Sequence, residues 1–141
     1  MDAAALREIC LGFPGSFEDY PFGPDIAVFK VRAAVAARGR HQAKVFALSA
    51  LDAEEFSVSL KCDPALAEQL RAAHPEITGA WHLNKRHWNG VRLDGELPDA
   101  MVRDMVEDSY DLVVATLNRA QQLQLGWSRL ARDAAQDEEG C

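Results

Sequence analysis

The chain has 141 residues, of which 48% are hydrophobic, and a formal net charge of −7 at pH 7; these values suit one domain with a continuous core. No apolar run approaches the roughly 20 residues needed to span a bilayer, so the sequence excludes an integral membrane protein. The three cysteines form no Cys-x-x-Cys pair and the N-terminus lacks the apolar run of a signal peptide. Together these features predict a reducing, cytoplasmic location.

Hydrophobic periodicity and turn residues divide the chain into successive helices and strands. The expected elements, in chain order, are helix 3–11, strands 26–32, 43–50 and 55–61, helix 64–73, strands 77–83 and 87–93, and a long amphipathic helix from Pro98 to about Leu117. The order α-β-β-β-α-β-β-α predicts a two-layer α+β domain, with one antiparallel sheet covered by helices on one face. We expect this domain to occupy residues 1–125 and residues 126–141 to form a short amphipathic turn and an acidic, disordered tail.

An aromatic segment with several prolines separates the first helix from the first expected strand. Its rings are Phe13, Phe17, Tyr20 and Phe22. Two uses of such a segment remain open at this point, since the rings would serve either to close one end of the core or to line a ligand cleft. Closing the core is the commoner use of aromatic side chains.

The last two expected strands carry a pattern that assigns side chains to opposite faces of the sheet. Alternation directs one set toward the core: Ile77, Trp81, Leu83, Val91 and Leu93. It directs His82, Trp88 and Arg92 to the outer face, with Gly90 leaving the indole uncovered from within its own strand. A bulge at Gly90 would reverse this assignment.

Charge is segregated along the chain. The window from Ile26 to Leu51 holds five basic residues and no acid, and the window from His82 to Arg92 holds three basic residues and no acid. Such windows are typical either of a surface that binds an anionic partner or of an ordinary hairpin surface in contact with water. Trp88 likewise fits either a stacking role or a half-buried position that stabilises the sheet.

The segment His-Leu-Asn-Lys-Arg-His-Trp-Asn at residues 82–89 resembles a signature of the MmcQ/YjbR family of bacterial proteins. Other similar pieces are Phe13-Pro14-Gly15, Tyr20-Pro21-Phe22-Gly23, Val28-Phe29-Lys30-Val31, Lys44-Val45-Phe46-Ala47, Leu60-Lys61-Cys62-Asp63-Pro64 and Ser109-Tyr110. The resemblance covers about residues 6–117. It implies DNA binding and a fold similar to CyaY (bacterial frataxin) and to type III secretion chaperones. The chain departs from the family where Gly90 replaces a typical Thr and where the connection around Arg38-Gly39-Arg40 is longer.

The two basic windows are expected to lie on two hairpins of one sheet and to bind DNA weakly, as the hairpin wings described for the similar family do. Basic side chains would neutralise phosphates, Trp88 would stack on a base or sugar, and Asn84 or Asn89 would contact a base edge. The candidate DNA-binding residues are Lys30, Arg32, Arg38, Arg40, Lys44, Asn84, Lys85, Arg86, His87, Trp88, Asn89 and Arg92.

Two other function classes stay open. A basic hairpin surface would also dock an acidic protein segment, which is the use that the likeness to secretion chaperones implies. An enzyme or a small-molecule-binding protein is less favoured, because the chain has no Gly-x-Ser-x-Gly elbow, phosphate-binding Gly-rich loop or dinucleotide fingerprint. We therefore expect no catalytic residues, no cofactor and no metal site, whereas the pattern leaves the oligomeric state open.

Overall fold

The computed structural model describes residues 1–34, 43–80 and 83–127. Its helices are α1 (Ala3–Leu11), α2 (Pro64–Ala73), α3 (Asp99–Val114) and α4 (Arg119–Gln124). Its strands are β1 (Ser16–Asp19), β2 (Ala27–Val31), β3 (Lys44–Ser49), β4 (Ser57–Lys61), β5 (Ile77–Gly79) and β6 (Trp88–Arg92). All neighbours are antiparallel in one sheet of order β1-β2-β3-β4-β6-β5. The predicted α+β architecture is confirmed, with β1 and α4 as additional elements.

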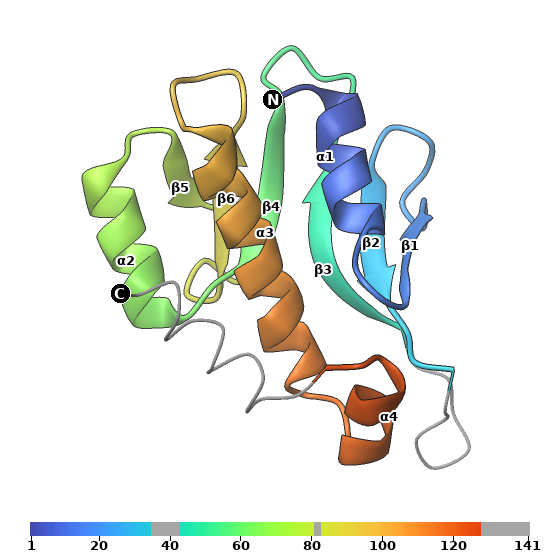
Figure 1. Ribbon diagram of the computed structural model, residues 1–141. Coiled ribbons are helices and arrows are strands. Elements are labelled where there is room, and N and C mark those ends of the chain that lie inside the picture. Colours follow the sequence, from blue (N-terminus) through green and yellow to red (C-terminus); the bar gives the residue numbers. More distant parts are fainter. Residues whose placement is uncertain (35–42, 81–82, 128–141) are drawn as a thin grey trace.

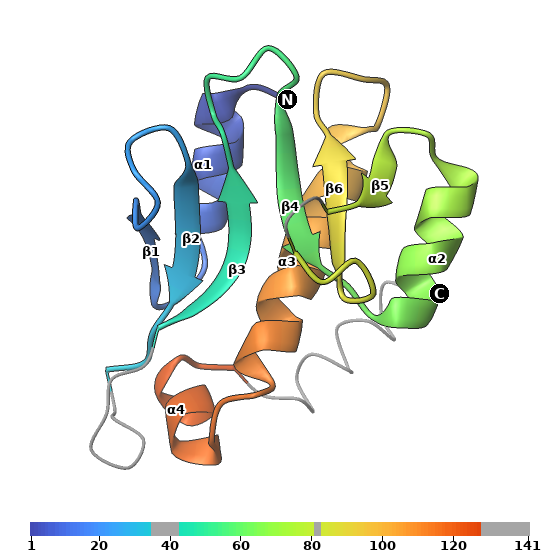
Figure 2. The ribbon, with the colours of Figure 1, turned by 180° about the vertical axis from the view of Figure 1, so that it is seen from behind.

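The helices divide the sheet into a covered face and an open one. Helices α1 and α3 lie across the inner face, and α2 lies beside the edge that β5 forms (Figure 1). Seen from behind, the strands β2, β3, β4 and β6 stand in front of these helices (Figure 2). We call this second side of the sheet the outer face.

Local signals in the sequence account for where the helices begin. The Oδ1 atom of Asp2 accepts a hydrogen bond of 2.8 Å from the Ala5 amide, which caps α1. Pro64 begins α2, where its missing amide donor costs no helical bond. The short helix α4, which was not predicted, begins with a capping box between Asn118 and Gln121.

The core lies between the inner face of the sheet and helices α1 and α3. Alternation along the strands and helical spacing along α3 bring together the following buried residues: Ala27, Phe29, Val31, Val58, Leu60, Ile77, Val91, Val102, Val106 and Val113. Three aromatic rings pack at the α1 side of this core. Phe13 stacks on Tyr110 at 4.7 Å between centroids, and Phe46 meets both rings edge to face.

A β-bulge in β3 changes the direction of the side chains that precede it. Phe29 pairs with Ala47 while the next residue of β2, Lys30, pairs with Val45, so Phe46 is the extra residue. Both Phe46 and Ala47 are buried in the core. The bulge therefore directs the side chain that comes two residues before Phe46, that of Lys44, toward the helices.

Ser109 of α3 completes the backbone hydrogen bonding where β3 and β4 diverge. These strands pair over only two residue pairs, Ala47 with Leu60 and Leu48 with Ser59. The Ser109 hydroxyl donates to the Phe46 carbonyl at 2.6 Å and accepts from the Lys61 amide at 2.9 Å. A buried serine thus satisfies two backbone groups that would otherwise lack partners, which is a structural role for this residue.

Some rings of the aromatic segment before β2 close the core, and others lie at the surface. Phe13 closes one end of the core, as one alternative predicted. Phe17 lies beneath the Arg32 guanidinium, 5.1 Å from its ring centroid. Tyr20 and Phe22 remain exposed, and Phe22 lines a cavity on the outer face.

The strand expected at residues 77–83 is represented by β5, which ends at Gly79. Pairing with β6 ends after Gly79, and Leu83 lines a cavity on the outer face together with Leu48 and Ser59. Leu83 therefore does not face the core as alternation predicted, because the chain leaves the sheet before reaching it. The assignments of Trp81 and His82 lie outside the described residues.

Candidate nucleic-acid interface

A compact turn at residues 84–87, which we call the basic turn, leads into β6. The carbonyl of Asn84 accepts hydrogen bonds from the amides of His87 and Trp88, at 3.1 and 2.9 Å. The Asn84 side chain accepts a further bond of 3.0 Å from the Arg86 amide. Asn84 is thus occupied in shaping the turn, while Lys85 and Arg86 are exposed at its tip.

Arg71 of α2 fixes the basic turn to the rest of the fold. Its Nε donates to the Asn89 side chain at 2.7 Å, and its Nη2 donates to the carbonyls of Lys85 and, at 3.3 Å, Trp88. On the other side of the turn, the His87 carbonyl accepts from the Cys62 amide at 2.7 Å. Arg71 was not among the expected site residues, since helical spacing alone does not show that a basic side chain will reach a turn.

Gly79 allows the stem of Lys85 to pack against the edge strand β5. A Cβ atom at Gly79 would lie 3.1 Å from the Cγ of Lys85 and 3.2 Å from its Cβ. Such contacts are shorter than ordinary van der Waals separations. The absence of a side chain at Gly79 therefore sets how closely Lys85 approaches the sheet.

Trp88 lies on the outer face, as alternation predicted, and is half-buried. The register pairs Trp88 with Lys61, Gly90 with Ser59 and Arg92 with Ser57, so these side chains share that face. The bulge considered at Gly90 does not occur, because the pairing of β4 with β6 runs without a shift. The indole thus has a basic neighbour on β4 and no side chain beyond it at Gly90.

Asn89 was expected to be available for a base edge, and this expectation is wrong. Its side chain is 2% exposed and faces inward between Leu60 and Gly79, since it alternates with Trp88 and Gly90. The carbonyl oxygen of Asn89 accepts the bond from Arg71. Asn89 therefore supports the basic turn from within.

The other expected basic residues do not all join this surface. Lys44 points to the helix side and donates to the Thr116 hydroxyl at 3.0 Å, because the bulge in β3 turns it away from the face that carries Trp88. Lys30 lies on the outer face but is paired with Asp19 at 2.8 Å, and this hydrogen bond holds the pKa of the Asp19 carboxyl below its usual value. Arg38 and Arg40 lie outside the described residues.

Arg92 lies at the opposite end of β6 from the basic turn. Its guanidinium contacts Asp94 at 3.1 Å, and the bond from Arg92 lowers the pKa of that carboxyl. Arg92 is thus on the predicted face, but it is not brought together with Lys85 and Arg86.

The strands give the sheet an acidic end and a basic end. Because neighbouring strands are antiparallel, the end of β2, the start of β3, the end of β4 and the start of β6 lie at one end of the sheet. The described basic residues at or beside this end are Arg32, Lys44, Lys61, Lys85 and Arg86. The connections at the other end carry Asp25, Asp52, Glu54, Glu55, Glu76, Asp94 and Glu96. Of the described residues, Arg32 and Lys44 of the first window and Lys85 and Arg86 of the second therefore lie at the same end of the sheet.

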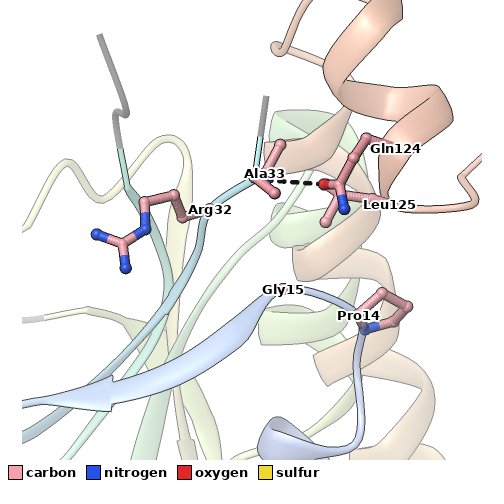
Figure 3. Close-up of a pocket in the computed structure, with 7 residues that line it drawn as sticks. Pro14, Gly15, Arg32, Ala33, Gln124 and Leu125 are labelled. Atoms are coloured by element: carbon pink, nitrogen blue, oxygen red, sulfur yellow. Dashed lines mark hydrogen bonds between the residues drawn. The ribbon is translucent and has the colours of Figure 1, made fainter. Parts of the chain in front are cut away.

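A cavity of about 620 Å³ lies near this end, and Arg32 and Gln124 are the polar side chains of its lining (Figure 3). It is enclosed by the start of β1, the end of β2 and α4, and Gln124 closes one side by accepting a 2.9 Å bond from the Ala34 amide. Arg32, the charged residue of its lining, directs its guanidinium away from Gln124 (Figure 3). We therefore do not place the candidate interface there.

Three groups with raised pKa values, those of Cys10, Cys62 and Tyr110, lie in packed parts of the fold and not in a site. Burial raises the pKa of the Cys10 thiol to about 12, and burial likewise raises the pKa of Cys62. Burial also raises the pKa of Tyr110 to about 12, and its hydroxyl donates to the Pro14 carbonyl at 2.6 Å. Tyr110 is thus a core residue, and the two thiols are protonated at neutral pH.

Within residues 1–34, 43–80 and 83–127, no three side chains of His, Cys, Asp or Glu are grouped so as to hold a metal ion. In the same part of the chain, no helix has the length and apolar character needed to cross a membrane.

Comparison with known proteins finds relatives across most of the chain. The YjbR family model matches residues 11–112. The uncharacterized protein YbdF of Escherichia coli O157:H7 is 32% identical over 126 residues, covering 86% of this chain and 95% of YbdF. The uncharacterized protein YjbR of E. coli K12 is 48% identical over 61 residues, covering 43% and 52% of the two chains.

Two solved structures have a similar fold. Protein DR2400 of Deinococcus radiodurans superposes with a TM-score of 0.79 at 34% identity and covers 90% of this chain and 89% of its own. A Pseudomonas syringae protein superposes with a TM-score of 0.64 at 28% identity and covers 80% and 99% of the two chains. With the family model matched over most of its length and the fold shared with these relatives, the chain belongs to the YjbR family.

Proposed function

We propose that this protein binds nucleic acid, as a DNA-binding protein, through the basic turn and the adjoining part of the outer face. The observation that carries the proposal is the geometry of the turn. Arg71, Asn84 and the Cys62 amide hold its backbone in place, so that Lys85 and Arg86 project from it beside the indole of Trp88. A preorganised pair of cations loses less freedom on binding than a flexible one does.

Phosphate contacts supply most of the affinity in this proposal. Lys85 and Arg86 neutralise phosphates and release counterions, while Trp88 stacks on an exposed base or sugar. Neither kind of contact distinguishes one base from another. Binding is therefore weak, strongly dependent on salt and only slightly dependent on sequence, and the net charge of −7 lowers it further.

The test measures the anisotropy of labelled duplex and single-stranded oligonucleotides at several salt concentrations. If about four phosphates of a duplex are contacted, log affinity should fall with log salt with a slope of roughly −3.6, and the double variant Lys85→Ala/Arg86→Ala should flatten that slope by about 1.8. Trp88→Ala should lower the affinity with little change in slope, because stacking releases few ions.

A matched control removes two exposed positive charges from the helices instead. Arg103→Ala/Arg119→Ala has the same net charge as the turn variant, but its residues lie on α3 and α4. It should leave the slope unchanged. If the protein binds no oligonucleotide at low salt, or if both double variants reduce binding equally, this site is rejected and docking of an acidic protein segment becomes the better candidate.

A further inference from the structure

The outer face of the sheet holds a cavity of about 380 Å³, a size within the range of small-molecule pockets. It lies mainly at the acidic end of the sheet, because its lining includes Ile26 before β2, Ala50 after β3 and Ser57 at the start of β4. The large apolar side chains of the lining are Phe22, Ile26, Leu48 and Leu83. The cavity therefore lies toward the opposite end of the sheet from the tip of the basic turn.

Phe22 contributes an aromatic ring to this cavity without belonging to the core. It lies in the connection between β1 and β2, and it is 71% exposed. The face of a phenyl ring carries partial negative charge, which attracts a cation placed over it. The ring can therefore contact both the apolar part and the positive part of a ligand.

Four carboxylates lie on the two connections that border the cavity, those of Asp25, Asp52, Glu54 and Glu55. Asp25 directly precedes Ile26 of the lining, about 3.8 Å away between Cα atoms, and Glu55 comes two residues before Ser57, at most about 7.6 Å away. All four carboxylates are exposed, and none forms an ion pair with another residue in the part of the chain that the structure describes.

Arg92 is a basic side chain beside the cavity, and it is already matched by an acid. The register places Arg92 next to Ser57 of the lining. Its Nη2 lies 3.1 Å from the Oδ2 of Asp94, and Glu55 also interacts with it electrostatically. Since Asp94 balances the charge of Arg92, the carboxylates of the two connections leave the surroundings of the cavity negative.

We propose that this cavity binds a small organic amine, whose apolar body packs against Phe22, Leu48 and Leu83 and whose ammonium group lies among the carboxylates at the rim. The hydroxyls of Ser57 and Ser59 in the lining are further acceptors for the ammonium hydrogens. An anion of the same shape is repelled, and a neutral molecule uses the walls but not the charge. The site goes beyond the proposed function, and its test requires no nucleic acid.

The first test compares three probes that share one apolar body, namely phenylbutylamine, phenylbutanol and phenylbutyrate. Their binding is measured from backbone amide chemical shifts in NMR titrations at neutral pH. The amine should bind most tightly and the carboxylate least, with the largest shifts at Ile26, Ala50 and Ser57 of the lining. Raising the salt concentration from about 0.01 M to about 0.15 M should weaken the binding of the amine and leave that of the alcohol unchanged.

The second test removes one carboxylate from each bordering connection. Asp25→Asn/Glu54→Gln should weaken amine binding about threefold at low salt and leave alcohol binding unchanged, because only the amine interacts with these charges. Glu68→Gln/Asp104→Asn is the matched control, since it changes the net charge equally at exposed positions of α2 and α3. It should leave the binding of all three probes unchanged.

The third test concerns the apolar wall. Phe22→Ala should weaken the binding of the amine and of the alcohol alike, by about fivefold, because both lose the same apolar contact. The ring is exposed, so the fold should persist, and the amide spectrum of the variant verifies it. Leu123→Ala, which truncates another exposed apolar side chain at 63% exposure, should leave binding unchanged.

Three results would each overturn this inference. One is equal affinity for the amine and the alcohol at low salt, and another is an equal effect of the two double variants on amine binding. The third is a set of amine-induced shifts that lies away from the cavity lining, or no shifts at all at millimolar amine. The oligonucleotide measurements at the basic turn are independent of these outcomes.

Discussion

Arg71 shows how one side chain determines the shape of a surface to which it does not belong. It is half-buried on α2, and its guanidinium reaches two carbonyls of the 85–88 segment and the Asn89 amide oxygen. The planar fork of arginine suits this arrangement, because its donors have fixed directions that a lysine ammonium cannot reproduce. The positions of the Lys85 and Arg86 charges thus depend on Arg71, a residue outside the proposed interface.

We expect Arg71→Lys to lower the free energy of unfolding by about 1–3 kcal/mol, because it keeps the charge but loses hydrogen bonds to partly buried acceptors. Urea unfolding checks the stability. Amide hydrogen exchange should be faster at Cys62 and Trp88, whose backbone bonds hold the turn. The exposed Arg103→Lys is the control, and equal effects of both changes would show that Arg71 does not position the turn.

Sequence periodicity predicted the direction of some site residues and failed for others, each time for a local reason. Trp88 and Arg92 face outward as alternation requires, since β6 is regular. Lys44 faces the helices because one extra residue in β3 reverses the alternation, and no single residue type indicates a bulge. Asn89 was wrong because the motif was taken as one exposed unit, although alternation itself turns it inward.

At the scale of elements, long periodic segments were predictable and short ones were not. The helices at 3–11 and 64–73 have the predicted bounds, because the Asp2 cap of the first and the initial Pro64 of the second agree with the apolar spacing. The strand β1 has four residues, including Glu18 and Asp19, and such residues have low strand propensity. Its formation depends on pairing with β2 and on Arg7 of α1, which are tertiary contacts that the local pattern does not contain.

The edge strand β1 is tied to α1 by an ion pair with a defined pH dependence. The two bonds from Arg7 to Glu18, at 2.7 and 2.6 Å, hold the pKa of the Glu18 carboxyl below its usual value. Since the folded pKa lies below the unfolded one, the pair stabilises the fold fully above the unfolded value of about 4.3 and loses this contribution as the pH falls through the folded value.

We expect Glu18→Gln to be less stable than the native protein at neutral pH and equally stable in acid, where Glu18 is protonated in both states. Chemical unfolding of both proteins between about pH 7 and pH 3 measures this difference. Asp2→Asn, which alters another exposed acid and keeps a capping side chain, is the control. A difference that persists unchanged in acid would mean that the pair contributes through packing alone.

Trp127 is one of the side chains that hold the segment after α3 to the domain, together with the buried Leu125. Trp127 packs against the core, and its Nε1 donates to the Asp111 carboxylate of α3 at 2.8 Å. This contact places α4 against the end of β2, where Gln124 caps the Ala34 amide.

We expect Trp127→Ala to lower the free energy of unfolding by about 1–3 kcal/mol while unfolding stays cooperative, because the ring loses partial burial and one hydrogen bond. Trp127→Phe keeps most of the packing and should recover roughly half of that loss. Thermal and urea unfolding of the three proteins give the comparison. Identical stability of all three would show that the ring does not anchor the segment.

At the scale of the whole molecule, the acidic and basic ends of the sheet separate negative from positive charge along the direction of the strands. The five residues of β4 separate the two ends by about 17 Å, at roughly 3.3 Å per residue. This separation exceeds the Debye length of about 8 Å at physiological salt but is shorter than the length of about 30 Å at 0.01 M. A polyanion at the basic end is therefore repelled by the acidic end only in dilute salt.

We expect Glu54→Gln/Glu55→Gln, at the acidic end, to raise oligonucleotide affinity about twofold or more at 0.01 M salt and to have no effect at 0.15 M. Binding curves at the two salt concentrations provide the measurement. An equal increase at both would indicate that these acids lie near the bound strand, and it would contradict the position given to the interface.

The strand order also determines when the proposed binding surface forms as the chain folds. Among the described strands, each sheet neighbour is also a neighbour in sequence except β4 and β6, which are separated by residues 62–87. Hairpin pairings close short loops, whereas this pairing must close a long one and bears a larger entropic cost. Lys61 and Trp88 lie on either side of it. A partly folded chain that has only its hairpins consequently lacks the surface, so any nucleic acid bound there reports on completed folding.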